Sequence, residues 1–270
     1  MIDSASFVSE LNQSGAKSSP AELTCWREGS SGLKELTSSG LSWPTASSFE
    51  EAKIVFAALS RRMSLYGGFN REASHVMERE ALVGWMVETA EAFGQSLQIV
   101  SIAVSLLDRV CGNYKFEGKH LKLLAGTCLF VASKLAGANA QALDLKTTHS
   151  LLGKGFTYQE ILNAELNIVS VLGFQLNPVI PLDFLYALFN IESSPRSEPT
   201  LQLCLFLVRK AMLSFEISRF TPLAIASAIL AIARTETACP EAWPQSLAQA
   251  TGLSLDSLRP ILGELIALTD

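Results

Sequence analysis

Residues 123–134 read LLAGTCLFVASK, and residues 223–234 read LAIASAILAIAR. Both segments are apolar on nearly all sides, which is typical of a helix surrounded by other helices at the centre of a bundle. Small residues fall at matching places, with Gly126 aligned to Ala226, and they allow neighbouring helices to approach closely. The repeat therefore predicts two small helical bundles, one after the other. Chance similarity between two apolar helices is the alternative.

Apolar residues also recur every three or four positions around these two segments. The spacing indicates helices at about residues 49–66, 76–93, 96–110, 119–135 and 158–172. Thr157 and Glu160 match the T-x-x-E pattern of a capping box, which marks the start of a helix. Because no segment alternates apolar and polar residues with period two, we predict an all-α protein.

The composition narrows the class of protein. Of the 270 residues 49% are hydrophobic and 17% are charged, and the net charge is -5. A negative charge disfavours a protein held to nucleic acid by phosphate contacts, and the low charged fraction suggests that a partner covers part of the surface. The N-terminus has no signal-peptide pattern, and the longest apolar block, residues 223–233, is too short to cross a bilayer. We therefore expect a soluble intracellular protein without a membrane partner.

The cysteines and histidines show no pattern of a metal or cofactor site. The five cysteines are scattered, form no CxxC pair, and do not lie at metal-ligand spacing to the histidines. Cys128 and Cys204 lie in apolar runs, where a thiol usually packs as a small hydrophobic group. We expect a reducing compartment, no cofactor and no metal.

A charged residue, Lys134, ends the first of the two apolar helices. A cation at a helix C-terminus interacts favourably with the last carbonyl groups, by roughly 0.3–1 kcal/mol, and Arg234 takes the matching place in the second repeat. Glu165 suggests a further role, because its neighbours on the helix surface are apolar and a dry, unpaired carboxylate there would be strongly unfavourable. In the second repeat, Leu262 or a residue next to it occupies the corresponding place, and no acid matches Glu165. Lys134 and Glu165 are therefore either structural residues or a functional pair of the first repeat alone.

Several segments, in order and spacing, resemble the cyclin family. The cyclin box is matched by REALVGWMVE (79–88), SLLDRV (105–110), LKLLAGTCLFVASK (121–134), YQEILNAELNIVSVLGFQL (158–176) and PLDFL (181–185), and the C-terminal cyclin fold by SRFTPLAIASAILAIAR (218–234) and SLDSLRPILGEL (254–265). The resemblance implies two tandem five-helix bundles with a preceding helix. We accordingly divide the chain into a flexible serine-rich tail (1–48), the preceding helix with the first cyclin box (49–187), and the C-terminal cyclin fold (188–270).

The resemblance implies a regulatory subunit rather than an enzyme. Such a subunit binds and activates a cyclin-dependent kinase in cell-cycle control, in the nucleus and cytoplasm, by favouring the kinase conformation that is set for phosphoryl transfer. In that family the residues that match Lys134 and Glu165 pair with each other and hydrogen-bond to the kinase backbone. By the same alignment, the apolar kinase-binding residues are Leu135, Phe174, Leu176 and Ile54. An ordinary place in the core is the alternative for Phe174.

Family members also carry an apolar patch that docks R-x-L peptides of substrates or inhibitors. The matching residues here are Leu82, Trp85, Glu88, Leu121 and Lys122. Trp85 and Glu88 fit the family pattern, whereas Ala81 is smaller than usual and Gly84 replaces a frequent aspartate. These departures weaken the prediction of peptide docking, and a packed core indole is the alternative for Trp85.

Three other functions compete with a kinase regulator. An enzyme is disfavoured because LLGKGF (151–156) lacks the spacing and the Ser/Thr of a phosphate-binding loop, and no nucleophile with its base stands out. A transcription module bound to nucleic acid is disfavoured by the acidic charge and by the lack of zinc-ribbon cysteines. A cyclin-fold scaffold or transcription-regulatory protein with a non-kinase partner stays open, because Lys134 and Glu165 would be compatible with it as structural residues.

Overall fold

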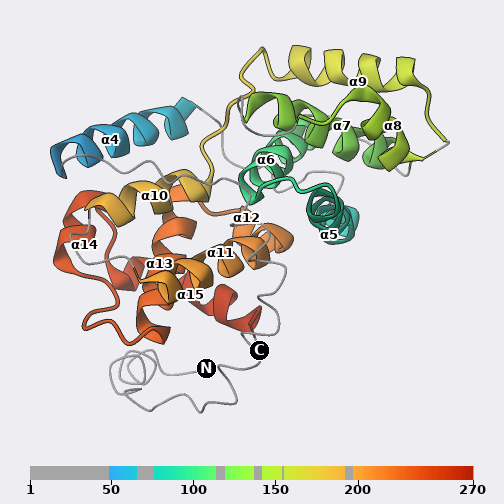
Figure 1. Cartoon of the computed structure of the whole chain (residues 1–270). Coiled ribbons are helices and arrows are strands. Elements are labelled where there is room, and N and C mark those ends of the chain that lie inside the picture. Colours follow the sequence, from blue (N-terminus) through green and yellow to red (C-terminus); the bar gives the residue numbers. More distant parts are fainter. Residues whose placement is uncertain are drawn as a thin grey trace.

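The computed structural model describes residues 49–65, 76–113, 119–136, 142–153, 155–191 and 197–269. Within these ranges every regular element is a helix, which confirms the all-α prediction (Figure 1). The serine-rich tail predicted at residues 1–48 lies outside the described residues. In the described part of the chain, no helix is long and apolar enough to cross a membrane.

The first bundle is built around one central helix, α7 (Lys119–Leu135). Every residue from Leu124 to Ser133 is buried, as its apolar sequence predicts. The helices that pack against α7 are α5 (Val76–Ala92), α6 (Leu97–Asn113), α8 (Leu145–Leu152) and α9 (Tyr158–Val171). The capping box predicted at Thr157 and Glu160 is present at the start of α9, since each side chain accepts a hydrogen bond from the other residue's backbone N–H.

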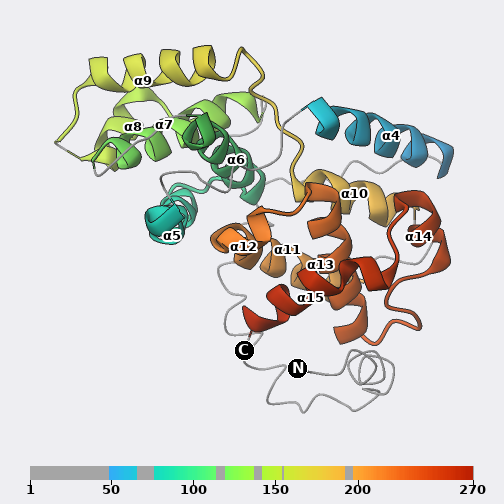
Figure 2. The same cartoon turned by 180° about the vertical axis from the view of Figure 1, so that it is seen from behind.

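The second bundle repeats this arrangement around α13 (Pro222–Glu236), which is buried from Ile225 to Ala231. The other helices of this bundle are α10 (Pro181–Ile191), α11 (Glu198–Leu213), α12 (Phe215–Ser218), α14 (Gln245–Thr251) and α15 (Leu255–Ala267). Figure 2 shows the two bundles from behind, with α7 and α13 each enclosed by its neighbours. The predicted tandem of two bundles is confirmed.

Small residues on the central helices do permit close approach. A Cβ atom added to Gly126 would lie 2.6 Å from Cδ2 of Leu152, so α8 packs against α7 at a distance that only glycine allows without a shift of that side chain. The thiols of Cys128 and Cys204 are fully buried, and burial raises the pKa of both. They therefore stay protonated at neutral pH and pack as small hydrophobic groups, as predicted.

A buried ion pair joins the two bundles. Arg79 of α5 donates from Nε and Nη2 to the two carboxylate oxygens of Asp108 on α6, each at 2.9 Å. Its Nη1 donates to the carbonyl oxygens of Met212 and Leu213, at 2.9 and 3.1 Å, where α11 ends. The guanidinium thus satisfies a carboxylate of the first bundle and two backbone acceptors of the second.

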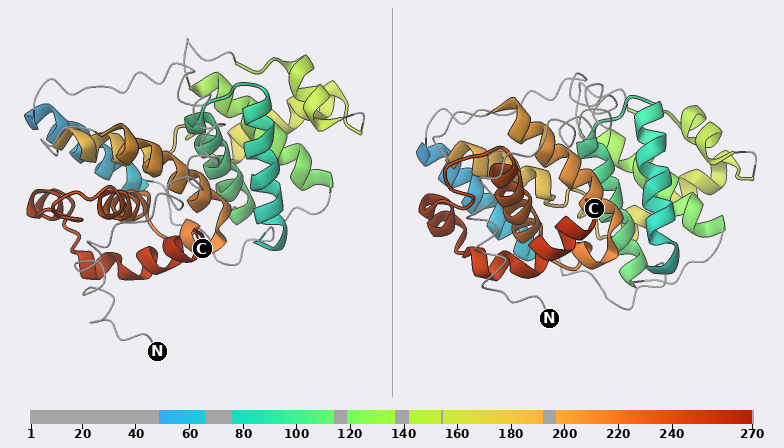
Figure 3. Two further views of the ribbon diagram at one scale, coloured as in Figure 1. Left: turned by 60° about the horizontal axis from the view of Figure 1, so that its bottom comes forward. Right: turned by 90° about the horizontal axis from the view of Figure 1, so that it is seen from below.

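The preceding helix, α4 (Phe49–Leu65), packs along α10 of the second bundle. The rings of Phe56 and Phe184 meet edge to face, with centroids 5.7 Å apart. Figure 3 shows α4 (blue) alongside α10 (gold) and away from α5. The domain division predicted after residue 187 would fall inside α10, whose residues from Phe184 to Phe189 are all buried.

Candidate partner-binding surface

The apolar helix α7 ends at the surface with an ion pair. Lys134 Nζ lies 2.6 Å from Oε1 of Glu165 on α9, and the two side chains are 42% and 23% exposed. The ammonium also lies 3.6 Å from the centroid of the Phe130 ring, within range of a cation–π interaction. Because burial along α7 stops at Ser133, the charge lies at the rim of the bundle and not inside it.

The second bundle uses its matching basic residue differently. Arg234 is buried, and its Nε donates to the carbonyl oxygen of Glu241 at 2.9 Å. Leu262, near the place that corresponds to Glu165, is also buried. The basic residue of the second bundle is therefore satisfied within its own bundle, whereas that of the first pairs with a carboxylate at the surface.

Large apolar side chains are exposed on α4, at the end of α7 and just after α9. Phe174 is 79% exposed and Ile54 of α4 is 70% exposed, while Leu135 is exposed at the end of α7. Leu176 is half-buried and packs against the core. We call Lys134, Glu165, Leu135, Phe174, Leu176 and Ile54 the contact surface. The exposure of Phe174 excludes the alternative that it is a core aromatic.

Phe174 has an unusual backbone. Its φ is 63°, and that of the preceding Gly173 is 55°, so two successive residues adopt the left-handed conformation. Glycine takes this conformation easily, whereas for phenylalanine it costs roughly 1–2 kcal/mol. The amide of Phe174 donates to the carbonyl oxygen of Val169 at 3.0 Å, which ends α9 with a tight turn. A strained backbone that presents an aromatic ring to solvent is typical of a functional position.

The structure adds exposed residues that the sequence analysis missed. Tyr158, Leu162 and Leu166 form one stripe on α9 with i, i+4, i+8 spacing, and Leu166 is 64% exposed. Both charged side chains of α9 have partners, because Glu160 belongs to the capping box and Glu165 pairs with Lys134. The sequence did contain a signal for this stripe. Helix α9 has more apolar residues than its buried face, at Ile161 and Ile168, requires, so some of them had to lie on a second face.

The residues of the predicted peptide-docking patch lie mostly near one another on α5 and α7. Trp85 is half-buried against the core, and Lys122 Nζ lies 5.4 Å from its ring centroid. Leu82 is half-buried and Glu88 is exposed, whereas Leu121 is buried beneath the surface. The docking of R-x-L peptides stays a prediction.

Comparison with known proteins gives two matching family models. One is the cyclin N-terminal domain, over residues 57–177, and the other is the cyclin C-terminal domain, over residues 179–269. G2/mitotic-specific cyclin-B1 of Oryzias luzonensis is 26% identical over 187 residues, which are 69% of this chain and 45% of that protein. Putative cyclin-F3-2 of Oryza sativa subsp. japonica is 29% identical over 191 residues, 69% of this chain and 47% of that protein. The chain thus spans less than half the length of these relatives.

Solved structures share the architecture at lower identity. A viral cyclin from herpesvirus saimiri has a TM-score of 0.67 and 22% identity, covering 80% of this chain and all of that one. A chain in the CAK complex of Chaetomium thermophilum bound to ATP-γ-S has a TM-score of 0.53 and 17% identity, covering 99% of this chain and 79% of that one. At these identities the likeness concerns the fold, namely two helical bundles in tandem.

Proposed function

Because this chain belongs to the cyclin family, we propose that it is a regulatory subunit that binds and activates a cyclin-dependent serine/threonine kinase in cell-cycle control. The observation that carries the proposal is the Lys134–Glu165 pair at the surface, with exposed Leu135 and the stripe of α9 on the same two helices. An exposed ion pair contributes little to stability, and large exposed apolar side chains are unfavourable in water. A kinase that covers both would account for their presence.

The pair offers hydrogen bonds that suit a peptide backbone. The Lys134 ammonium has three N–H donors, and the salt bridge to Glu165 occupies one of them. The remaining donors can reach carbonyl oxygens of the partner, and the remaining lone pairs of Glu165 can accept its backbone N–H groups. Once water is excluded by the surrounding apolar side chains, such charge-assisted hydrogen bonds are strong and sensitive to geometry.

The proposed mechanism is a shift in the conformations of the kinase and not chemistry in this chain. Binding favours whichever kinase conformation fits the contact surface better, and the shift is limited by the difference in affinity for the two conformations. Support for a cell-cycle role comes from relatives that are named G2/mitotic-specific cyclins. The stripe of Tyr158, Leu162 and Leu166 implies that the partner kinase presents an uncharged apolar surface to α9.

The test is a reconstitution with a panel of purified cyclin-dependent kinases. We expect the chain alone to transfer no phosphoryl group from ATP to a peptide substrate, and at least one kinase to bind it and to phosphorylate that substrate faster when it is added. Kinases of unrelated families serve as controls. A panel in which no member binds, or in which binding leaves every kinase unchanged, would contradict the proposal and favour a non-kinase partner.

Replacing Phe174 with asparagine separates binding from stability. Asparagine tolerates the left-handed backbone, so we expect the free energy of unfolding to stay the same or to rise by about 1 kcal/mol. Loss of the exposed ring should weaken kinase binding about tenfold or more, as for other buried aromatic anchors at interfaces. Calorimetric titration and urea unfolding measure the two effects. The control Phe93→Asn removes an exposed ring just after α5 that is not one of the contact-surface residues, and it should leave the affinity unchanged.

A further inference from the structure

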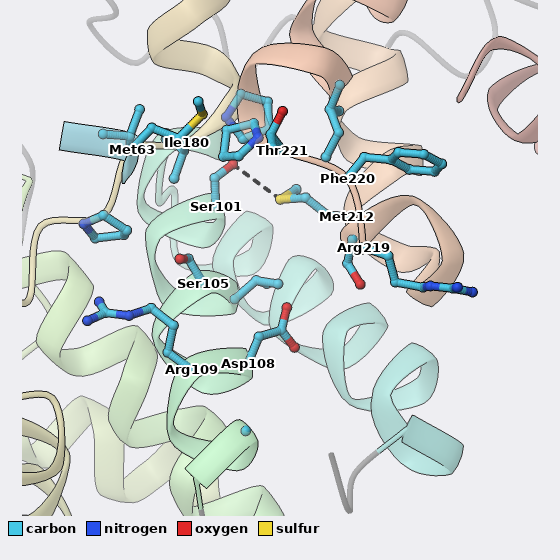
Figure 4. Close-up of a pocket in the computed structure, with 18 of the residues that line it drawn as sticks. Met63, Ser101, Ser105, Asp108, Arg109, Ile180, Met212, Arg219, Phe220 and Thr221 are labelled. Carbon is cyan, nitrogen blue, oxygen red and sulfur yellow. Dashed lines mark hydrogen bonds between the residues drawn. The ribbon is translucent and has the colours of Figure 1, made fainter. Parts of the chain in front are cut away.

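The segment that presents Phe174 is packed only in part. Leu172, Val179 and Ile180 are buried at its two ends, whereas Gly173, Phe174 and Gln175 are exposed between them. Residues 172–180, here called the linker segment, connect α9 to α10. On its inner side lies a cavity of about 820 Å³ between the two bundles, lined in part by Gly173, Gln175 and Pro178. Figure 4 shows this cavity, with Ile180 at one edge and Met212 across from it. Side-chain packing therefore accounts for the two ends of the linker segment but not for the conformation of residues 173–175 between them.

Two guanidinium groups hold the linker segment from neighbouring helices. Arg109 Nη1 of α6 donates to the carbonyl oxygen of Gln175 at 2.7 Å. Arg62 Nη2 of α4 donates to the carbonyl oxygen of Asn177 at 2.8 Å. Arg109 lies on the wall of the cavity (Figure 4). The two carbonyl groups follow Phe174 by one and by three residues, so both bonds restrain the backbone next to the strained position.

We propose that Arg109 and Arg62 are positioning residues that keep Phe174 turned outward for the kinase. A left-handed phenylalanine persists only where its surroundings determine the backbone, and charge-assisted hydrogen bonds to carbonyl groups provide such a restraint. Since Arg62 belongs to α4, that helix restrains the linker segment as well as carrying Ile54. The importance of this positioning for binding rests on the proposed function, whereas the restraint itself does not.

Amide hydrogen exchange tests the restraint without any kinase. The amide of Gln175 donates to the Leu172 carbonyl oxygen, and that of Leu176 to the Phe174 carbonyl oxygen. In Arg109→Met and in Arg62→Met, these amides should exchange about tenfold faster, while those inside α7 keep their rates. Arg61→Met removes a neighbouring exposed arginine of α4 and should change neither set. Unchanged exchange at residues 174–176 in both variants would overturn the proposal.

A double-mutant cycle tests whether the arginines act through Phe174. With a kinase identified by reconstitution, Arg109→Met should weaken binding about tenfold when Phe174 is present and have almost no further effect in Phe174→Ala. Arg109→Lys, which keeps a positively charged N–H donor without the planar guanidinium, should recover part of the loss. Equal losses on both backgrounds would overturn the coupling. If Arg109→Met does not fold, the same double-mutant cycle can be measured with Arg62→Met, in the last turn of α4.

The exchange measurement and the binding measurement test different conclusions, so either conclusion can be contradicted while the other holds. If Phe174→Ala binds the kinase as tightly as the unchanged chain, the proposed contact role of Phe174 is wrong. The exchange rates still decide whether Arg109 and Arg62 restrain the linker segment in that case. Faster exchange together with a non-additive loss of affinity supports both conclusions.

Discussion

Replacing Lys134 with alanine is expected to weaken kinase binding about 100-fold while lowering the free energy of unfolding by less than about 1 kcal/mol. The small stability effect follows from the exposure of the pair, since an ion pair in contact with water loses much of its attraction to solvation. The large binding effect follows from the partner, which would cover the pair and leave Glu165 buried without its cation. Titration with the kinase and urea unfolding measure the two quantities.

Several variants make this prediction specific. Glu165→Ala should cost about as much binding as Lys134→Ala, and the double variant little more, because the two residues act as a unit. Lys146→Ala removes an exposed lysine of α8 and serves as the matched control. The exchanged pair, Lys134→Glu with Glu165→Lys, keeps the ion pair but moves its donors, so binding should stay weak. Full binding by the exchanged pair, or by Lys134→Ala, would contradict the proposed role.

The largest loss of stability is expected from Arg79→Met, at about 3–5 kcal/mol. The substitution leaves the Asp108 carboxylate buried without a cation, and it removes the donor to the carbonyl oxygens that end α11. The affected contacts hold the two bundles together, so unfolding should also become less cooperative. A loss of this size is a large part of the stability of an ordinary domain, and it is measured by urea unfolding.

The chain contains a matched control for this pair. Arg209 of α11 and Glu91 of α5 also connect the bundles, with nitrogen and oxygen 2.6 Å apart, but both are partly exposed. Arg209→Met should therefore cost less than about 1 kcal/mol. Arg79→Met with Asp108→Leu replaces the buried pair with apolar side chains and should regain part of the loss. If Arg79→Met costs no more than Arg209→Met, the buried pair does not hold the bundles together.

Local patterns in the sequence predicted the parts of the fold that depend on neighbouring residues. The burial of α7 and α13 follows from their composition, and the capping box at Thr157 from four residues. The pairing of Lys134 with Glu165 was expected from the resemblance to the cyclin family, whereas the residues alone required only a cation or an edge position for Glu165. Arg79 and Asp108 belong to two of the segments that resemble the cyclin box. The contact of Arg79 with the end of α11 could not be predicted, because it depends on how the two bundles pack together.

Other features could not be predicted because they depend on the whole chain. The left-handed backbone of Phe174 is unfavourable for its residue type, so no propensity indicates it. The apolar stripe of Leu162 and Leu166 has the same sequence pattern as a stripe that faces the core, so the sequence does not show that it is exposed. The packing of α4 on α10 joins helices that are far apart in the sequence, and periodicity alone does not show which bundle receives a preceding helix.

That packing of α4 on α10 has a consequence for synthesis on the ribosome. The first bundle is formed by helices consecutive in the chain, so its contacts are local and can form early. Helix α4 emerges before that bundle, yet its docking site is completed only after the first bundle has been translated. Until then its apolar residues stay uncovered, and a chain interrupted before α10 would have Lys134 and Glu165 in place but no site for the helix that carries Ile54 and Arg62.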